Sequence, residues 1–299
     1  MTALTRRRFL AISAACAYTP VAAAASARWH GSALGAKASL RVEGLTNTEA
    51  APIFDAVTAE LTRLENIFSL YRPHSELSRL NTDGHLIAPS PELLKVLSLC
   101  SALHDASDGA FDPTIQPLWM AFAKGAELSE LNRAQRGIGW HKVLVNTNAI
   151  RLPDPGFSGL TLNGIAQGEI TDRIASLLNG FGLRNILVDM GEISARGTRS
   201  DGSDWQVGLA GPKHIVRGRL SLRDRAVATS APAMMKLAAG HHHILDPKNR
   251  MAPQSTVSVS AANAALADGL STALCVTPDR KVRSVLSHFP DAKLEMLVP

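Results

Sequence analysis

The sequence is poor in aromatic residues and in net charge. Aromatic residues make up 5% of the 299 positions, and the formal net charge is +5 at neutral pH. Three of these positive charges are Arg6, Arg7 and Arg8, so the chain without its first 27 residues has a net charge of +5 − 3 = +2. Because no basic run is interleaved with aromatic residues, the composition gives no support to a nucleic-acid-binding function.

Cysteine is also rare, with three residues in the whole sequence and no Cys-x-x-Cys pair. Thiol redox chemistry and a zinc site of cysteines therefore lack support. Cys100 and Cys275 are flanked by leucine, which predicts buried thiols, with one disulfide as the alternative in an oxidising compartment. The Gly-x-Ser-x-Gly and His-Glu-x-x-His motifs are absent as well, so the serine hydrolase and zinc protease classes lose their usual support.

The N-terminus has the pattern of an export signal. A basic stretch at residues 5–10 contains paired arginines, a small and apolar run follows at residues 11–25, and Ala25-Ser26-Ala27 has the pattern of a cleavage site. The run is too short and too rich in alanine for a membrane span of ~20 strongly apolar residues. We therefore expect a cleaved twin-arginine signal over residues 1–27 and a soluble mature chain in the periplasm. A general secretory signal and a lipoprotein anchored at Cys16 are the alternatives.

Residues 28–299 are predicted to form one domain that mixes helices and strands. Hydrophobic periodicity and capping residues predict helices over residues 50–68, 90–109, 168–181 and 262–276, and another that includes residues 282–286. Strands are expected at residues 186–188, 205–209, 220–222 and 256–260. Since the two types do not alternate regularly, the expected class is α+β, with helices packed on antiparallel or mixed sheets.

Two segments carry groups suited to a cation and a phosphate. Asp268 and Thr272 are four residues apart in a predicted helix, so their oxygens share one face and could bind Mg²⁺. An exposed aspartate and a threonine bonded to its own helix is the simpler alternative. Residues 162–168 contain Gly164 and Gly168 and lead into a helix, where backbone amides could approach a phosphate. An ordinary glycine-rich turn explains that segment equally well.

Three successive histidines, His241, His242 and His243, suggest a metal site. Neighbouring residues of a strand point to opposite faces, so the three cannot all bind one ion in regular structure. We therefore expect one of them to point inward, followed by a turn at Asp246-Pro247.

Taken in order along the chain, seven segments resemble the ApbE family of FAD:protein FMN transferases. They lie at residues 68–81, 111–119, 162–168 with Asp172, 187–193, 228–230, 243–247 and 267–274. The resemblance spans about residues 29–299. It implies an ApbE-like α+β architecture, related to the T-fold, with two lobes and a central cleft. It also implies a magnesium-dependent enzyme that moves FMN from FAD onto a Ser or Thr hydroxyl of an exported or membrane flavoprotein and releases AMP.

The same resemblance assigns roles to individual residues. Asp268 and Thr272 would bind Mg²⁺ together with the carbonyl of Ala166, and Asp268 and His243 would be catalytic. The acceptor of the hydroxyl proton stays open between an aspartate near the metal and His243. The residues implied in FAD binding are Ser69, Tyr71, Asp112, Asn163, Gly164, Ile165, Asp189, Glu192, Thr229, Ser230 and His243.

The sequence departs from the family pattern at Thr161, Gln167 and Ala231, where Asp, Lys and Gly are usual. The missing lysine removes a positive charge near the phosphates, and the missing aspartate removes a possible carboxylate of the cleft. Two other functions stay open, and these departures motivate the second of them. These are a magnesium-dependent FAD pyrophosphatase and a non-catalytic flavin-binding accessory protein for nitrous oxide reductase maturation. The twin-arginine start and residues 161–168 also resemble the NosX subgroup, which implies the membrane protein NosR as acceptor.

Overall fold

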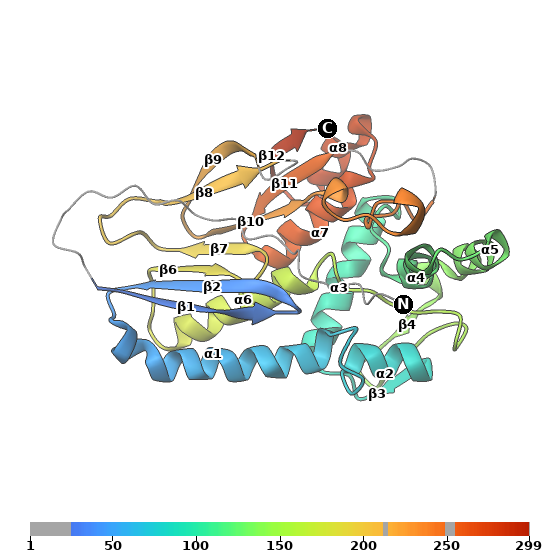
Figure 1. Cartoon of the computed structure of the whole chain (residues 1–299), viewed down its shortest axis with the longest axis horizontal. Coiled ribbons are helices and arrows are strands. Elements are labelled where there is room, and N and C mark those ends of the chain that lie inside the picture. Colours follow the sequence, from blue (N-terminus) through green and yellow to red (C-terminus); the bar gives the residue numbers. More distant parts are fainter. Residues whose placement is uncertain (1–24, 212–214, 249–254, 299) are drawn as a thin grey trace.

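A seven-stranded antiparallel sheet lies at the centre of the part of the chain that the computed structural model describes, residues 25–211, 215–248 and 255–298 (Figure 1). Its order is β1-β2-β6-β7-β10-β11-β12, and each neighbouring pair is antiparallel. The strands are β1 (Ser26–Ala33), β2 (Ala36–Glu43), β6 (Ile186–Asp189), β7 (Ile193–Arg196), β10 (Arg225–Ser230), β11 (Thr256–Ala261) and β12 (Lys293–Val298).

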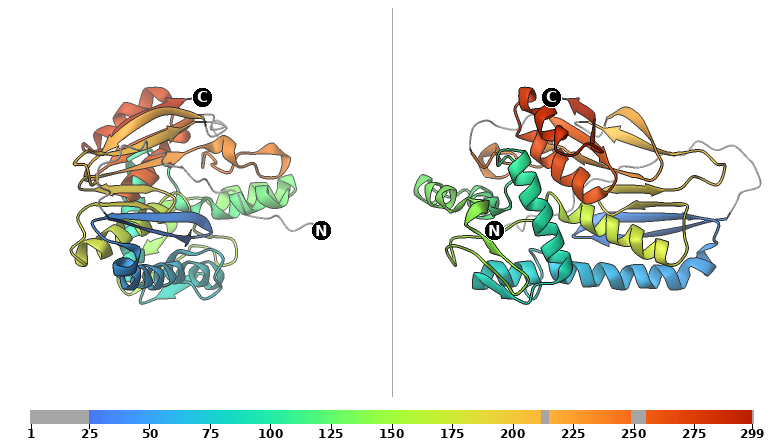
Figure 2. Two further views of the ribbon diagram at one scale, coloured as in Figure 1. Left: turned by 60° about the vertical axis from the view of Figure 1, so that its left-hand side comes forward. Right: turned by 180° about the vertical axis from the view of Figure 1, so that it is seen from behind.

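Helices cover one face of this sheet, as the view from behind in Figure 2 shows. They are α1 (Asn47–Phe68), α3 (Pro91–Ala106), α6 (Ala166–Gly180), α7 (Ala264–Cys275) and α8 (Asp279–Ser287). The first residues of α6 and α7 approach closely at Gly168, where a β-carbon would lie 2.4 Å from the carbonyl oxygen of Ala264. Only glycine allows this approach, so Gly168 fixes how near the two helices can lie.

A two-stranded hairpin covers part of the opposite face of the sheet. It consists of β8 (Trp205–Ala210) and β9 (Val216–Leu222), and alternate residues such as Trp205 and Val207 are buried. These side chains pack against Ile193 and Val227 of the central sheet in a second hydrophobic cluster. The hairpin therefore buries the part of this face that β7, β10 and β12 form, while residues of β1 such as Arg28 and His30 stay exposed.

The remaining elements gather at one end of the molecule, on the right in Figure 1. They are α2 (Glu76–Asp83), α4 (Gln116–Lys124), α5 (Leu128–Gly137), a small sheet of β3 (His85–Ile87), β5 (Ala149–Arg151) and β4 (Leu144–Val145), and short 3₁₀ turns at Pro113–Ile115, Trp140–Lys142, Pro232–Met234 and Ala238–Gly240.

The predicted α+β class and the five predicted helices are confirmed, with small shifts in their ends. Ser90 caps α3 and Pro91 is its first residue, as expected. The helix predicted over residues 262–276 begins later, at Ala264, because Asn263 is its cap. Cys100 and Cys275 are free and buried, so the thiol prediction is correct and the alternative disulfide does not form. The central cleft between two lobes stays a prediction.

The predicted signal peptide falls mostly outside the described residues, since the description begins at residue 25. Ser26 and Ala27, which the prediction assigned to the signal, are the first residues of β1 and pair with Glu43 and Val42. Ala27 is fully buried. Cleavage after Ala27 would therefore remove two paired residues from the edge of the sheet, while the signal itself stays a prediction.

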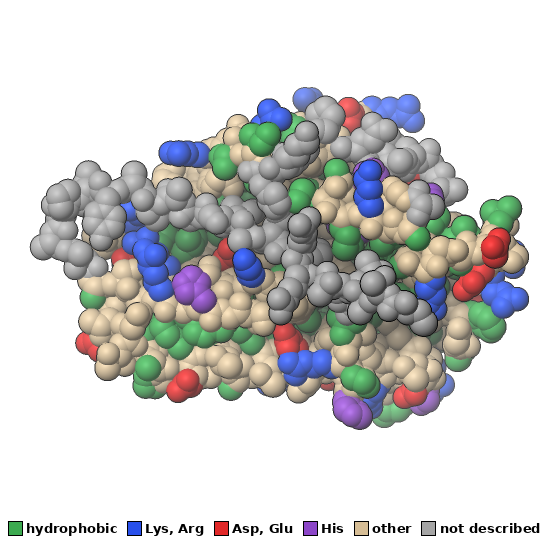
Figure 3. Space-filling view, in the orientation of Figure 1, with side chains coloured by type: hydrophobic (Ala, Val, Ile, Leu, Met, Phe, Trp, Pro, Cys, Tyr) green, Lys and Arg blue, Asp and Glu red, His purple; other side chains and the backbone are tan. Residues whose placement is uncertain are grey.

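Two surface properties bear on partners. Within the described part of the chain, no helix combines the length and the apolar character that crossing a bilayer requires. The Lys and Arg side chains of the described residues are scattered over the face shown in Figure 3, where they do not gather into one patch. The absence of a nucleic-acid partner stays a prediction from composition.

Candidate functional site

The late helix and the glycine turn that the sequence singled out lie against each other. The Oδ2 atom of Asp268 accepts a hydrogen bond from the backbone N–H of Gly168 at 3.2 Å. One turn further along α7, Thr272 faces Gly164, where a β-carbon would lie 2.8 Å from Thr272 Oγ1. Ala166 lies between these two contact points in the sequence. The structure therefore brings Asp268 and Thr272, two of the predicted metal ligands, against the turn that contains the third, Ala166.

Side chains from two elements fix the start of α7. Asn263 accepts a hydrogen bond from the N–H of Leu266 at 2.9 Å, as an N-cap does. The carboxylate of Asp172, on α6, accepts hydrogen bonds from the N–H groups of Ala264 and Ala265 at 2.8 and 2.9 Å. Because Asp172 binds the first turn of α7 from α6, it sets the register in which Asp268 meets the glycine turn.

Burial makes the carboxylates around this interface hard to ionise. Burial raises the pKa of Asp268 to about 7. The hydrogen bond from the N–H of Gly168 acts to lower this pKa, and the charge of Asp172 acts to raise it. Burial and then the charge of Asp268 raise the pKa of Glu192 well above its usual value. Burial also raises the pKa of Asp172 and of Asp189 to about 6. The site therefore favours a bound proton or a bound cation.

The donor set suits a hard divalent cation. Asp268 is 4% exposed, and no lysine or arginine of the described residues forms an ion pair with it. Within those same residues no group of three or more His, Cys, Asp or Glu side chains could hold a metal ion. A site at this interface would therefore use one carboxylate, one hydroxyl and one carbonyl, which are oxygen ligands of the kind Mg²⁺ takes, with water or phosphate completing the shell.

The residues at the end of β10 reach the same interface. The Oγ atom of Ser230 lies 3.1 Å from Thr272 Oγ1 and 2.8 Å from Ser271 Oγ. The backbone N–H of Thr229 donates to the carboxylate of Glu192 at 3.2 Å. Both residues were predicted to bind FAD, and the structure places Ser230 beside a predicted metal ligand.

The turn between β6 and β7 carries Asp189 and Glu192. Asp189 Oδ1 accepts a hydrogen bond from the N–H of Gly191 at 3.1 Å, and Gly191 has a φ of +107°, which favours glycine. A β-carbon at Gly191 would lie 2.4 Å from Nε2 of Gln167. Gln167, one of the three departures from the family pattern, therefore packs directly against this acidic turn.

The residues just before α6 differ in which of their atoms a ligand could reach. Ile165 is fully buried, so its side chain belongs to the hydrophobic core and its backbone alone could contact a ligand. Asn163 is exposed, and its N–H donates to Thr161 Oγ1 at 3.3 Å. The departure at Thr161 thus supplies a side-chain oxygen to the turn, as an aspartate could also do.

Ser69 and Tyr71 lie in the loop after α1. The Oγ atom of Ser69 accepts hydrogen bonds from the N–H groups of Tyr71 and Arg72 at 3.0 and 3.1 Å. Its carbonyl accepts hydrogen bonds from the hydroxyls of Ser75 and Ser78 at 2.5 and 2.9 Å. Ser69 therefore shapes the loop, and Tyr71, which is 52% exposed, is the residue of the pair that the loop presents to solvent.

Asp112 also organises its own loop. Its carboxylate accepts hydrogen bonds from the backbone N–H and the hydroxyl of Thr114 at 2.9 and 2.5 Å, and from the N–H of Trp140 at 3.3 Å. These contacts cap the short 3₁₀ turn that begins at Pro113. The structure therefore gives Asp112 a local structural role among the described residues.

The three successive histidines point to different neighbours, as the strand argument predicted. The ring of His241 lies 4.2 Å from that of Phe122, between centroids. Nδ1 of His242 lies 3.1 Å from the carbonyl oxygen of Pro232, and Nδ1 of His243 lies 3.2 Å from that of Met235. The three rings therefore do not share one ion. The expected turn follows them, where Asp246 Oδ1 accepts a hydrogen bond from the N–H of Lys248 at 3.0 Å.

His243 has the properties of a neutral base. Burial lowers its pKa, so the ring is uncharged at neutral pH. The backbone carbonyls of Met235 and Pro232 act against burial and raise that pKa, and Nδ1 of the ring lies 3.2 Å from the carbonyl oxygen of Met235. The backbone carbonyl of His243 accepts a hydrogen bond from Nε1 of Trp119 at 3.0 Å, which ties the histidine loop to α4.

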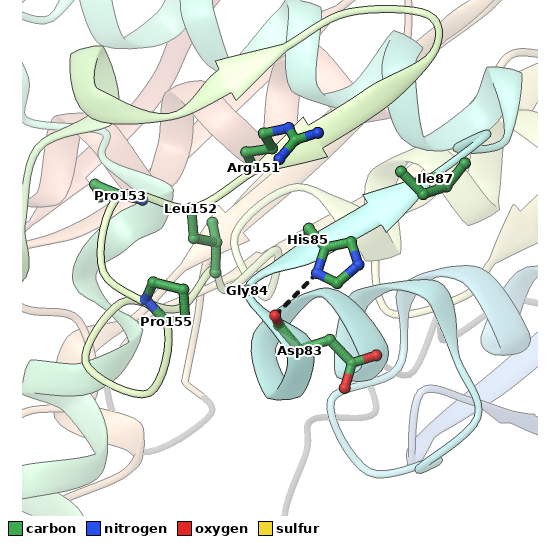
Figure 4. Close-up of a pocket in the computed structure, with 8 residues that line it drawn as sticks. All are labelled: Asp83, Gly84, His85, Ile87, Arg151, Leu152, Pro153 and Pro155. Carbon is green, nitrogen blue, oxygen red and sulfur yellow. Dashed lines mark hydrogen bonds between the residues drawn. The ribbon is translucent and has the colours of Figure 1, made fainter.

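A pocket of about 430 Å³ lies elsewhere, between the end of α2 and the edge of the small sheet (Figure 4). His85 and Arg151 line it together with Pro153 and Pro155, and Nδ1 of His85 lies 3.1 Å from the carbonyl oxygen of Asp83. None of the predicted site residues lines this pocket, so it is separate from the α6–α7 interface.

Two residues of the interface were not assigned roles from the sequence. Ser271 is buried between Asp268 and Thr272 and donates to the backbone carbonyl of Asp268 at 3.0 Å. Asp172 was noted in the pattern, but its contact with α7 depends on how the two helices pack. The position of Ser271 three residues after Asp268 could have placed it on the same helix face.

Comparison with known proteins gives a consistent result. A family model described as the ApbE family matches residues 34–297. The chain is 30% identical over 261 residues to the FAD:protein FMN transferase of Chlamydia muridarum, covering 81% of this chain and 78% of that protein. It is 26% identical over 271 residues to the FAD:protein FMN transferase of Haemophilus influenzae, again covering 81% and 78%.

Solved structures show the same fold. The flavin transferase ApbE of Vibrio cholerae superposes with a TM-score of 0.80 at 23% identity, covering 91% of this chain and 94% of that chain. The apo form of the flavinyl transferase ApbE of Pseudomonas stutzeri superposes with a TM-score of 0.76 at 24% identity, covering 91% of each. At these identities the superpositions bear on the fold alone.

Proposed function

The chain belongs to the ApbE family, and on that premise we propose that it is an FAD:protein FMN transferase. The observation that carries the proposal is the contact of Asp268 and Thr272 with the turn at residues 164–168. This contact joins oxygen ligands for a cation to a helix N-terminus that favours phosphate. The proposed substrate is FAD, and the proposed acceptor is a Ser or Thr hydroxyl of a flavoprotein.

The proposed reaction is a phosphoryl transfer. The acceptor oxygen forms a bond to the phosphorus on the FMN side of FAD, the bond from that phosphorus to the bridging oxygen breaks, and AMP leaves. The side chains of Asp268 and Thr272 and the carbonyl of Ala166 would hold Mg²⁺. When bound there, Mg²⁺ offsets the negative charge of the two phosphates.

The chain's own residues orient the reactants and move a proton. The positive end of α6 favours the diphosphate near Asp268. We assign the proton of the acceptor hydroxyl to His243, because burial lowers the pKa of its ring and a neutral imidazole can accept a proton. An aspartate near the cation is the alternative proton acceptor. Tyr71 is exposed and would lie against a ring of FAD.

The test is mass spectrometry of a candidate acceptor incubated with the full chain, FAD and Mg²⁺. We expect the mass of FMN on the acceptor, and its loss in the Asp268→Asn variant, which keeps an oxygen for the N–H of Gly168. Asp201→Asn, at an exposed aspartate, is the matched control. Rapid AMP release without an acceptor would favour the pyrophosphatase, and bound flavin without turnover would favour the accessory protein.

We further propose that the chain is exported by the twin-arginine pathway and acts in the periplasm on NosR. The support is the paired arginines and the sequence of residues 161–168. Replacing Arg6 and Arg7 by Lys should keep the protein out of the periplasmic fraction. FMN should be absent from NosR in cells that lack this chain and return when the chain is supplied.

A further inference from the structure

Three hydroxyl groups form a chain between α7 and the end of β10. The hydroxyl of Ser271 donates to the backbone carbonyl of Asp268 at 3.0 Å. Ser271 Oγ lies 2.8 Å from Ser230 Oγ, and Ser230 Oγ lies 3.1 Å from Thr272 Oγ1. The chain therefore begins at a carbonyl of one predicted metal ligand and ends at the hydroxyl of another.

The carbonyl sets the direction of every bond in this chain. Each hydroxyl has one proton to donate, and a carbonyl can only accept. Ser271 commits its proton to Asp268, so it must accept from Ser230. Ser230 then has no proton left for Thr272, so it must accept from Thr272.

The proton of Thr272 therefore points to Ser230, and its lone pairs are left for another partner. A hydroxyl binds a cation through its lone pairs, so the fixed direction prepares Thr272 as a metal ligand. We propose that Ser271 and Ser230 are positioning residues that hold the Thr272 hydroxyl in the orientation that binds Mg²⁺. This inference rests on the proposed function, because it assumes the cation site at Asp268 and Thr272.

The surroundings keep the chain fixed. Ser271 is fully buried and Ser230 is 9% exposed, so water cannot readily replace a lost partner. The thiol of Cys275 lies 3.6 Å from the carbonyl oxygen of Ser230, which ties β10 to α7 at this point. Thr277, near the end of α7, also donates to a helix carbonyl, that of Ala273 at 2.8 Å, but no hydrogen bond joins it to this chain among the described residues.

The test measures the binding of Mn²⁺, used as a probe for Mg²⁺, by calorimetry on the full chain with and without FAD. In Ser271→Ala the proton of Ser230 is free to turn toward Thr272, which then accepts it and presents its own proton to the site. We expect a loss of metal affinity of about tenfold. Ser230→Ala should weaken binding by a similar factor, and the matched control Thr277→Val should bind as the unaltered chain does.

A double-mutant cycle separates this inference from the proposed function. In a Thr272→Val background, Ser271→Ala should cause no further loss, because the hydroxyl that it orients is gone. Unchanged binding in Ser271→Ala and Ser230→Ala, with a loss in Thr272→Val, would overturn the inference and leave the metal site standing. Unchanged binding in Thr272→Val would overturn the metal site itself. Circular dichroism identifies any variant that fails to fold, in which case the other serine variant decides.

Discussion

Gly164 and Thr272 are in direct contact across the interface of α6 and α7. A β-carbon at position 164 would lie 2.8 Å from Thr272 Oγ1 and 2.9 Å from Cγ2, closer than non-bonded atoms approach. Gly164→Ala should therefore push the Thr272 side chain out of place. We expect metal affinity to fall by about tenfold while the helices still form, as measured by calorimetry and circular dichroism.

Gly180, the last residue of α6, supplies the matched control. Apart from its chain neighbours and the backbone of its own helix, no atom of the described residues lies within 4 Å of the position its β-carbon would take. Gly180→Ala should leave metal affinity unchanged and slightly stabilise the fold, because alanine restricts the unfolded chain more than glycine does. Equal metal affinities in the two variants would contradict the assigned role of Thr272.

The sequence could indicate the central feature of the candidate site because that feature is local. Asp268 and Thr272 are four residues apart, and helical geometry alone places them on one face. The helix caps were predictable for the same reason, as Ser90 and Pro91 illustrate. The meeting of α7 with the glycine turn followed from the resemblance, since about 100 residues separate Asp268 from Gly168.

The sheet was much less predictable. β1, β2, β7, β10 and β12 were not predicted. The runs of β7 and β10 are short and mix small and polar residues, such as those of Ala226–Ser230. β2 was missed although its apolar and polar residues alternate from Ala36 to Glu43. β2 pairs with β6 across more than a hundred intervening residues, and single-sequence patterns carry no information on such pairing. Likewise, nothing local indicated that Ser271 and Ser230 would meet.

The carboxylates predict a pH-dependent stability of the metal-free protein. The pKa of Asp268 is raised to about 7, and those of Asp172 and Asp189 to about 6. The folded state therefore binds protons more tightly than the unfolded state does. The resulting stability is fully present below the unfolded pKa of about 4 and is lost as pH rises through about 6 to 7. The Tm should fall over that range.

Added Mg²⁺ should oppose this loss, because the cation replaces the protons at the site. The rise in Tm on adding Mg²⁺ should be larger at about pH 8 than at about pH 5. Differential scanning calorimetry measures both quantities. In Asp268→Asn the rise in Tm on adding Mg²⁺ should disappear at both pH values. A rise in Tm that is larger at the acidic pH would refute this account.

Asp172 should contribute to stability through the cap that it gives α7. Asp172→Ala leaves the buried N–H groups of Ala264 and Ala265 without acceptors, so the free energy of unfolding should fall by about 2 kcal/mol. Asp172→Asn retains one acceptor oxygen and should lose less. Urea denaturation measures the change, with the exposed Asp201→Ala as control. Equal stability of all three variants would show that Asn263 alone is a sufficient cap.

Gln167 offers a test of why this chain departs from its family. Its side chain packs against Gly191, in the turn that holds Asp189 and Glu192, so a lysine there would place its ammonium beside buried carboxylates. That charge should lower the pKa of Asp189 and attract the FAD phosphates. We expect the KM for FAD in Gln167→Lys to fall by about tenfold at low salt, with the difference shrinking as salt is added. Gln167→Met keeps the length without the charge and should not lower the KM.

The two variants together decide whether charge matters at position 167. If both have the same KM for FAD at every salt concentration, the side chain does not act on FAD through its charge. The departure from lysine then has another cause, in the packing of this turn.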